Sequence, residues 1–227
     1  MPDLIIEDRD MSDATTTGVK HGRITDPATR GSYAMDQSWV LEWHLHGIES
    51  GKNFPDTIGG EFAGFKSDVP SAEPPKDGLI VSGGWTDERE CLNYTDREVA
   101  DRLAAKGNAE GWPRQGVKGV STFMVTWRYE APHVTRGYRW FITKDGWDES
   151  TRLTRAHFQE KPFYEEISLL DPYSEHREEL APKTEISAVL PEGKQGHHVI
   201  LLLWIVAESP MAFYQTLDVD FDKPPVK

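Results

Sequence analysis

Alternating apolar and polar residues predict β-strands in the second half of the chain. From position 119 to 130 the sequence reads GVSTFMVTWRYE, in which every second residue from Phe123 to Tyr129 is aromatic or branched aliphatic. A two-residue period of this kind is typical of a strand with one buried face. The segment GYRWFIT at 137–143 predicts a second strand soon after it.

Two more strands are predicted near the C-terminal end. The run VILLLWIV at 199–206 is continuously apolar, which is expected for a central strand covered on both faces. Residues 213–221 return to alternation and place Phe213 and Leu217 on one face. Strands of these two kinds, with little helix between them, predict an all-β fold, an antiparallel β-sandwich.

One helix is expected, beginning after Thr95. Thr95 and Glu98 have the spacing of a capping box, in which each side chain binds the backbone amide of the other residue. Gly107 is placed to end the helix. Three residues are expected to share its apolar face: Val99, Leu103 and Ala104.

The remaining segments predict loops and a division of the chain. Glycine and proline are concentrated between 47 and 84, and they predict a large irregular insertion because they favour turns. The segment 1–20 is polar, does not form a recognisable secretory signal, and is expected to be a disordered or removable leader. One domain is predicted at 21–222, followed by a tail at 223–227.

The composition indicates one globular domain that does not bind nucleic acid. The chain has 227 residues, 37% of them hydrophobic, which suits one domain with a sizeable core. Its net charge of -13 opposes binding to phosphate backbones and favours neutral polymers or small molecules. The longest apolar run is far shorter than the roughly 20 residues that span a bilayer, so no membrane partner is expected. Because Cys91 is the single cysteine, no internal disulfide can form.

Histidine is the candidate metal ligand, since no CxxC, HExxH, GxSxG or phosphate-binding glycine motif occurs. His44 and His46 would point to the same side of a strand and could bind one metal. We prefer the interpretation that these two histidines are polar side chains in a loop. His197 and His198 precede an apolar strand, and we interpret them as a strand-entry turn rather than as ligands.

Four blocks of sequence resemble, in order, the bacterial lytic polysaccharide monooxygenases and fusolins, which are auxiliary activity family ten or chitin-binding type-4 proteins. The blocks are HGRITDPATR at 21–30, ESGKNFP at 49–55 followed by DGLIVSGG at 77–84, PHVTRGYRWFITKDGWDESTRLTRAHF at 132–158, and HVILLLWIVAESPMAFYQTLDV at 198–219. The resemblance covers 21–222. It implies an immunoglobulin-like or fibronectin type III-like β-sandwich with a partly helical insertion, in a secreted, extracellular protein.

The resemblance implies one copper ion per chain, held by His21 and His133 in a histidine brace. The α-amino group and imidazole of His21 would supply two nitrogens and the imidazole of His133 a third, and tetragonal nitrogen ligation favours Cu(II). A nitrogen in the Lys20–His21 peptide bond is a planar amide without an available lone pair. The leader must therefore be removed before such a brace can form.

The resemblance also assigns roles around the copper. Phe213 corresponds to an aromatic residue at the axial position, and Ala131 to a small residue beside the open copper face. Glu49 corresponds to a carboxylate that positions peroxide or relays protons, and Trp204 to a buried aromatic residue near the copper. From the residues alone, Phe213 is ordinary core packing and Glu49 is a solvated charge.

Substrate contacts are implied at Trp43, where many family members carry an exposed aromatic residue that stacks on sugar rings, and at Glu208, an acidic position near the binding face. Taken alone, a tryptophan in so aromatic a chain is more often a core residue. The implied activity is cleavage of crystalline chitin, oxidised at C1, by a monomer that uses hydrogen peroxide or dioxygen and an external electron donor. Cellulose is a second candidate substrate. The alternative is a non-catalytic polysaccharide-binding or adhesion protein, which applies if His21 is not released as the N-terminus.

Overall fold

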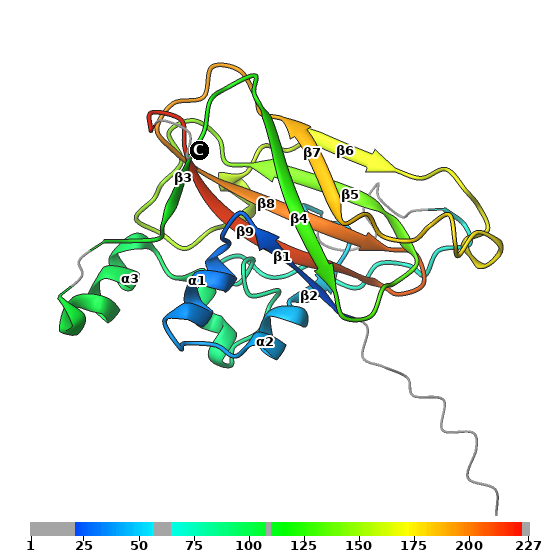
Figure 1. The fold of residues 1–227 in the computed structure, drawn as a ribbon, viewed down its shortest axis with the longest axis horizontal. Coiled ribbons are helices and arrows are strands. Elements are labelled where there is room, and N and C mark those ends of the chain that lie inside the picture. Colours follow the sequence, from blue (N-terminus) through cyan, green and yellow to red (C-terminus); the bar gives the residue numbers. More distant parts are fainter. Residues whose placement is uncertain (1–20, 57–64, 108–109, 224–227) are drawn as a thin grey trace, which may run out of the picture.

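The computed structural model describes residues 21–56, 65–107 and 110–223, so the leader predicted at 1–20 and most of the predicted tail lie outside the described residues. Two β-sheets form a sandwich (Figure 1). The smaller sheet has the order β1 (Gly22–Asp26), β4 (Thr122–Tyr129), β7 (Glu185–Val189). The larger sheet has the order β2 (Glu49–Gly51), β9 (Met211–Asp220), β8 (His197–Val206), β5 (Thr135–Ile142), β6 (Tyr164–Ile167), and β3 (Arg114–Gly116) pairs with β9.

The strand pairing confirms the predicted antiparallel sandwich. Within the described ranges, each pair in the two sheets is antiparallel except β3 with β9. In β4 the predicted alternation holds, since Val125 and Trp127 are buried whereas Met124 is 48% exposed. Trp204 of β8 and Phe213 of β9 join them in one core between the sheets.

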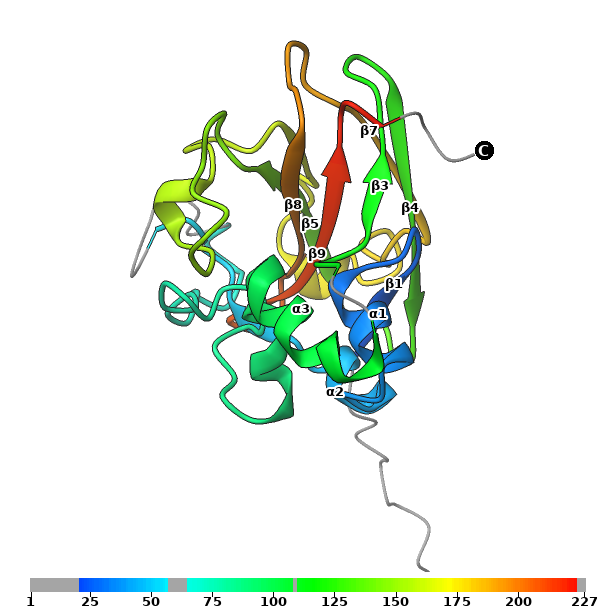
Figure 2. The ribbon, with the colours of Figure 1, turned by 90° about the vertical axis from the view of Figure 1, so that its left-hand side faces the viewer.

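The other face of the larger sheet is covered by helices and irregular segments (Figure 2). The helices are α1 (Arg30–Asp36), α2 (Glu42–His46) and α3 (Asp96–Leu103), with short 3-10 helices at η1 (Glu88–Asn93), η2 (Ala104–Lys106), η3 (Arg155–His157) and η4 (Tyr173–Glu175). Because β8 lies between β5 and β9 and is packed on both faces, all ten of its residues are buried. The central strand predicted at 199–206 is confirmed.

Helix α3 begins as its sequence predicts. The Thr95 hydroxyl accepts a hydrogen bond from the Glu98 amide at 3.2 Å, and the Thr95 amide donates to the Glu98 carboxylate at 2.8 Å. Gly107 ends the following 3-10 turn with φ 75°, a left-handed conformation that favours glycine. The predicted apolar face was wrong at one position, because Ala104 lies past the end of α3 and is exposed.

Several elements were not predicted. These are α1 and α2, the 3-10 helices, and five strands outside the predicted segments: β1, β2, β3, β6 and β7. The interpretation of His197 and His198 as a strand-entry turn was wrong, since both are buried residues of β8 and pair with Asp220 and Val219 of β9. None of the helices in the described part of the chain is long and apolar enough to cross a membrane.

Candidate metal centre

His21 is the first described residue, and its backbone extends the pairing of β1 with β4. Its amide donates to the Ala131 carbonyl at 3.1 Å, and its carbonyl accepts from the Glu130 amide at 2.9 Å. Ala131 lies two residues before His133, on the connection from β4 to β5. The pairing of two edges of the sandwich therefore brings His21 to the loop that carries His133.

Both imidazoles lie over the same buried aromatic side chain. The ring centroid of Phe213 is 6.3 Å from that of His21 and 5.6 Å from that of His133. Phe213 is fully buried and stacks on Trp204, with centroids 4.6 Å apart. The aromatic core between the sheets thus forms a rigid floor beneath the two histidines.

The donor atoms fit a metal. Nδ1 of His21 is buried and has no hydrogen-bond partner among the described residues, which is unusual because buried polar atoms are nearly always paired. Burial and the charges of His46 and His133 lower the pKa of His21, against a backbone contact at His46 that raises it, and the net lowering favours the neutral imidazole that a metal requires. In His133, Nδ1 contacts a Glu208 carboxylate oxygen at 3.1 Å, so Nε2 is the nitrogen that would ligate a metal.

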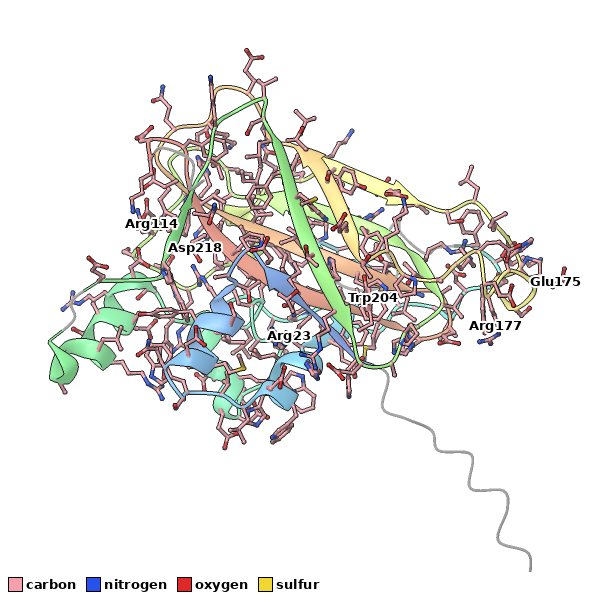
Figure 3. The ribbon with its side chains drawn as sticks, in the orientation of Figure 1. Arg23, Arg114, Glu175, Arg177, Trp204 and Asp218 are labelled. Atoms are coloured by element: carbon pink, nitrogen blue, oxygen red, sulfur yellow. The ribbon has the colours of Figure 1, made fainter. Side chains whose placement is uncertain are left out.

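Glu208 lies behind His133 and is only 11% exposed. One of its carboxylate oxygens contacts His133 and accepts from the Val134 amide at 3.3 Å, while the other accepts from the Arg177 guanidinium at 2.9 Å. Figure 3 labels Arg177 near one end of the molecule and Trp204 nearer its middle. Sequence reasoning gave no role to the acidic region at 159–197, from which Arg177 comes.

Glu49 and Ala131 are each paired with one residue of the group formed by His21, His133 and Phe213. Glu49 is directly opposite Phe213 in the pairing of β2 with β9. Burial raises the pKa of the Glu49 carboxyl, and the Arg89 guanidinium opposes this rise. Ala131, which pairs with His21, presents only a methyl group beside it. The strand pairing therefore brings Glu49 next to Phe213, and Ala131 next to His21.

Trp43 is not a core residue. It lies on α2 and is 62% exposed, with its ring centroid 3.7 Å from that of His44. Its helix contacts β1, so the indole is carried by the element next to His21.

Neither interpretation of the pair His44 and His46 was right, because both residues are in α2. His44 is buried, and its Nδ1 accepts a hydrogen bond from the Leu41 amide at 3.0 Å. Nε2 of His46 is buried without a hydrogen-bond partner among the described residues, at 3.9 Å from Glu42 and 4.0 Å from Glu130. His46 is a neighbour of the metal centre that sequence reasoning missed.

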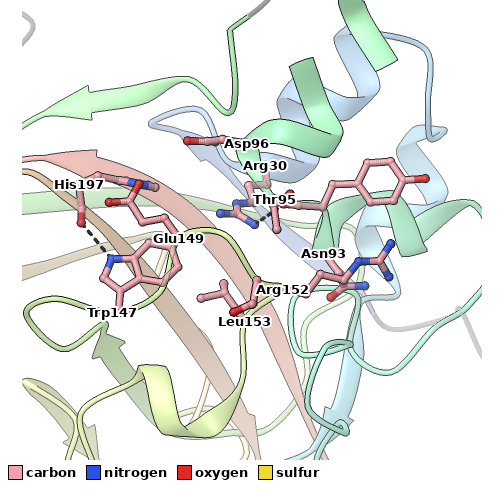
Figure 4. A pocket seen from close by; sticks show the side chains of 11 residues that line it. Arg30, Asn93, Thr95, Asp96, Trp147, Glu149, Arg152, Leu153 and His197 are labelled. Atoms are coloured by element: carbon pink, nitrogen blue, oxygen red, sulfur yellow. Dashed lines mark hydrogen bonds and ion pairs between the residues drawn. The ribbon is translucent and has the colours of Figure 1, made fainter. Parts of the chain in front are cut away.

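A second group with suitable ligand atoms lies at the opposite end of β8 (Figure 4). The ligand atoms of Asp96, Glu149 and His197 all lie within 4.8 Å of one another. The Arg114 guanidinium already contacts Asp96 at 2.5 Å and Glu149 at 3.3 Å. The two ring nitrogens of His197 contact Glu149 at 2.7 Å and Asp218 at 2.8 Å. Protein cations therefore neutralise this group, and we assign it a structural role.

The two-sheet sandwich, with His21 and His133 both against Phe213 at one end, agrees with the fold and the pair of histidines that the sequence resemblance implies. The family described as "lytic polysaccharide mono-oxygenase, cellulose-degrading" matches residues 21–219, and the chain belongs to this family.

Relatives with assigned names are similar over most of the chain. A protein called GlcNAc-binding protein A from Vibrio cholerae serotype O1 is 30% identical over 214 residues, which cover 92% of this chain and 36% of the relative. A protein of the same name from Shewanella oneidensis is 26% identical over 210 residues, covering 90% and 36% of the two chains. The chain thus spans about a third of the length of these curated relatives.

Solved structures confirm the fold. A chitin binding domain from Burkholderia pseudomallei is 34% identical and superposes with a TM-score of 0.76, covering 88% of this chain and 98% of the other. An AA10 lytic polysaccharide monooxygenase from Streptomyces lividans is 26% identical with a TM-score of 0.66, covering 88% and 100%. The expected immunoglobulin-like or fibronectin-like sandwich is thereby confirmed.

Proposed function

We propose that this protein, once it begins at His21, cleaves crystalline chitin oxidatively with one copper ion. The observation that carries the proposal is the buried Nδ1 of His21, which lacks a hydrogen-bond partner in the described residues and lies with His133 over Phe213. Membership of the monooxygenase family makes copper the metal to expect. An external electron donor and hydrogen peroxide or dioxygen complete the reaction.

The ligands would be the released amine and Nδ1 of His21 and Nε2 of His133. When bound, copper supplies the one-electron chemistry that activates the oxidant. With peroxide, the carbon–hydrogen bond at C1 becomes carbon–hydroxyl and water is the second product. The hydroxylated carbon then expels the neighbouring sugar oxygen, which breaks the glycosidic bond.

The other residues of the site shape this reaction. Glu49, whose pKa is raised by burial, is placed to hold or deliver a proton. Phe213 closes the side of the site toward the core, because its buried ring fills the space under both imidazoles. Ala131 leaves room for the oxidant, since its side chain is a single methyl group. Glu208 keeps the His133 ring in one tautomer and orientation.

Chitin is the substrate that we favour over cellulose. Relatives carry the name GlcNAc-binding protein A, and one similar structure is a chitin binding domain. The family description names cellulose, which remains the second candidate. A neutral polymer suits a chain of net charge -13, and the exposed indole of Trp43 offers an apolar face to a sugar ring. Such a substrate is consistent with an extracellular protein.

Copper titration tests the brace. Protein that begins at His21 should bind Cu(II) much more tightly than protein that begins at Met1, since only the first has the free amine. His133→Ala in the shorter chain should lose most of the copper affinity and all oxidation, yet remain folded, because His133 contributes little to the core. Equal copper affinity of the long and short chains would exclude the brace.

A non-catalytic polysaccharide-binding protein is the second candidate, favoured by the names of the relatives. It predicts adsorption to chitin without new chain ends. Mass spectrometry of soluble products, after incubation with copper, ascorbate and peroxide, distinguishes the two. Aldonic acid ends support the oxidase, and intact chitin with normal adsorption supports the binding protein.

A further inference from the structure

Trp85 presents an exposed indole that the site described above does not use. It is 43% exposed and lies on the segment that leads into η1. The guanidinium carbon of Arg89 lies 3.6 Å from the centre of its ring. One face of the indole is therefore covered by a cation, and the exposed area belongs to the rest of the ring.

Arg89 is held in place by its own hydrogen bonds, so it fixes the orientation of the Trp85 indole that stacks on it. Its side chain is only 7% exposed. Nε and Nη2 donate to the two Asp87 carboxylate oxygens at 2.9 Å and 2.5 Å, and Nη1 donates to the Gly47 carbonyl at 3.1 Å. The guanidinium also lowers the pKa of Asp87 to about 2, so that this pair stays ionised. A ring on such a support loses little conformational freedom when it binds a ligand.

This stack borders the metal centre. A Cβ at Gly47 would lie 3.5 Å from Nη1 of Arg89 and 3.8 Å from Cε1 of His21. On the same segment as Trp85, Gly83 is packed against Glu49, because a Cβ there would lie 3.2 Å from the Glu49 amide nitrogen. The Arg89 support of Trp85 is therefore close to His21 through Gly47, and the segment that carries Trp85 is close to Glu49 through Gly83.

Trp85 and Trp43 lie on two segments that are neighbours on this side of the molecule. Helix α2 and η1 are in contact and are drawn side by side in Figures 1 and 2. Nε2 of His44, next to Trp43, lies 3.7 Å from the carboxylate of Glu88 in η1. The exposed Glu88 contacts His44, which neighbours Trp43, and the partly exposed Asp87 holds Arg89, which stacks on Trp85, so both segments carry hydrogen-bond acceptors.

We propose that Trp85, supported by Arg89, is a second sugar-stacking platform that binds another ring of the β-1,4-linked polysaccharide held at His21 and His133. This inference rests on the proposed function and extends it. A pyranose ring fits because it combines an apolar C–H face, for the indole, with equatorial hydroxyls, for Asp87 and Glu88. Trp43 and Trp85 then bind the polymer at two points, which fixes the direction of the polysaccharide across the metal.

The test is adsorption to chitin beads in EDTA, so that copper and catalysis do not enter. Trp85→Ala should weaken adsorption about fivefold to tenfold, and Trp85→Phe should retain most of it. Met124→Ala, at a similarly exposed position on the outer face of β4, is the matched control and should bind normally. Thermal unfolding of each variant shows that it is folded.

A measurement on the unmodified chain makes the test independent of the alanine variant. In ¹⁵N spectra, the indole N–H signal of Trp85, assigned through Trp85→Phe, should shift on addition of an N-acetylglucosamine hexamer. Unchanged adsorption of Trp85→Ala, an equal loss in Met124→Ala, or an indole signal that does not move would each overturn the platform. These outcomes leave the copper proposal intact, since that is tested by titration with Cu(II) alone.

Discussion

Glu208 uses both of its carboxylate oxygens to connect residues from different parts of the chain. One oxygen fixes the ring of His133, and the other is held by Arg177. A carboxylate that orients a ligating imidazole commonly contributes to metal affinity without touching the metal. Position 208, which the family resemblance suggested as a substrate contact, thus lies where it can control the orientation of His133, the proposed metal ligand.

Glu208→Gln should therefore weaken copper binding to the chain that begins at His21. The expected loss is about tenfold to a hundredfold, the range typical of such carboxylates. Isothermal titration with Cu(II) measures it, and electron paramagnetic resonance should show an altered nitrogen environment. Glu178→Gln, on the exposed loop next to Arg177, is the control. Unchanged copper affinity in Glu208→Gln would show that the carboxylate does not orient His133.

His197 predicts a pH dependence of stability. Burial alone would lower its pKa, but Asp218 and Glu149 act more strongly together and raise it above the ordinary 6.5. A raised folded pKa means that the stabilisation is fully present below the unfolded value and is lost as pH rises through the folded value. As the pH rises through the folded pKa of His197, the free energy of unfolding should therefore decrease more in the natural chain than in His197→Gln.

Urea unfolding at a series of pH values measures this difference. His176→Gln is the matched control, because the side chain of His176 contacts Glu179 at 3.4 Å near the surface. It should keep the pH slope of the natural chain. Parallel pH profiles for the natural chain and His197→Gln would show that the imidazolium does not contribute.

At the scale of elements, α3 offers the most direct test of a sequence signal. Thr95→Ala removes one half of the capping box and should destabilise the protein by about 1 kcal/mol. Chemical denaturation measures the change. Arg97→Ala, at an exposed position of the same helix, should change stability by less than about 0.5 kcal/mol. Equal effects of the two substitutions would mean that the cap does not stabilise α3.

The elements that could be predicted are those whose periodic pattern is long. β4, β5, β8 and β9 have eight to ten residues each, and burial follows the sequence in β4, which alternates, and in β8, which is buried throughout. The alternating sequence of β9 is not matched by its burial, because helices and irregular segments cover its second face. β6 and β7 have four and five residues and lie at sheet edges, so too few positions alternate for a signal. Helices α1 and α2 are one to two turns long, which is also too short to show a helical period.

The candidate site could be predicted only where residues belong to recognisable blocks. His21, His133 and Phe213 were placed through the family resemblance, and the structure brings them together. The contact of Arg177 with Glu208 spans 31 positions and that of Arg89 with Gly47 spans 42. No local pattern encodes such pairings, because they arise when loops from separate strands meet on the folded sandwich.

At the scale of the whole molecule, metal binding and stability are linked. A ligand that binds the folded state alone stabilises it by about 2.7 kcal/mol when its concentration is a hundred times its dissociation constant. Copper should therefore raise the melting temperature of the chain that begins at His21 by several degrees. The chain that begins at Met1 and the His133→Ala variant should show little change in differential scanning calorimetry.

An equal shift in all three proteins would mean that copper acts elsewhere, for example through the group of Asp96, Glu149 and His197. Arg114→Ala, which removes the cation of that group, is then the informative variant. A copper-induced rise confined to the chain that begins at His21 supports a single site at the end of the sandwich.

The hydrogen bond from the His21 amide to the Ala131 carbonyl has a consequence for the order of events in the life of the protein. The strand edge, both rings and their aromatic support are already assembled while that nitrogen is still acylated. Hydrolysis of one bond would then turn a weakly basic nitrogen into a strong donor within a finished scaffold. Maturation by proteolysis would need no refolding, and the metal could be acquired after the protein has reached its destination.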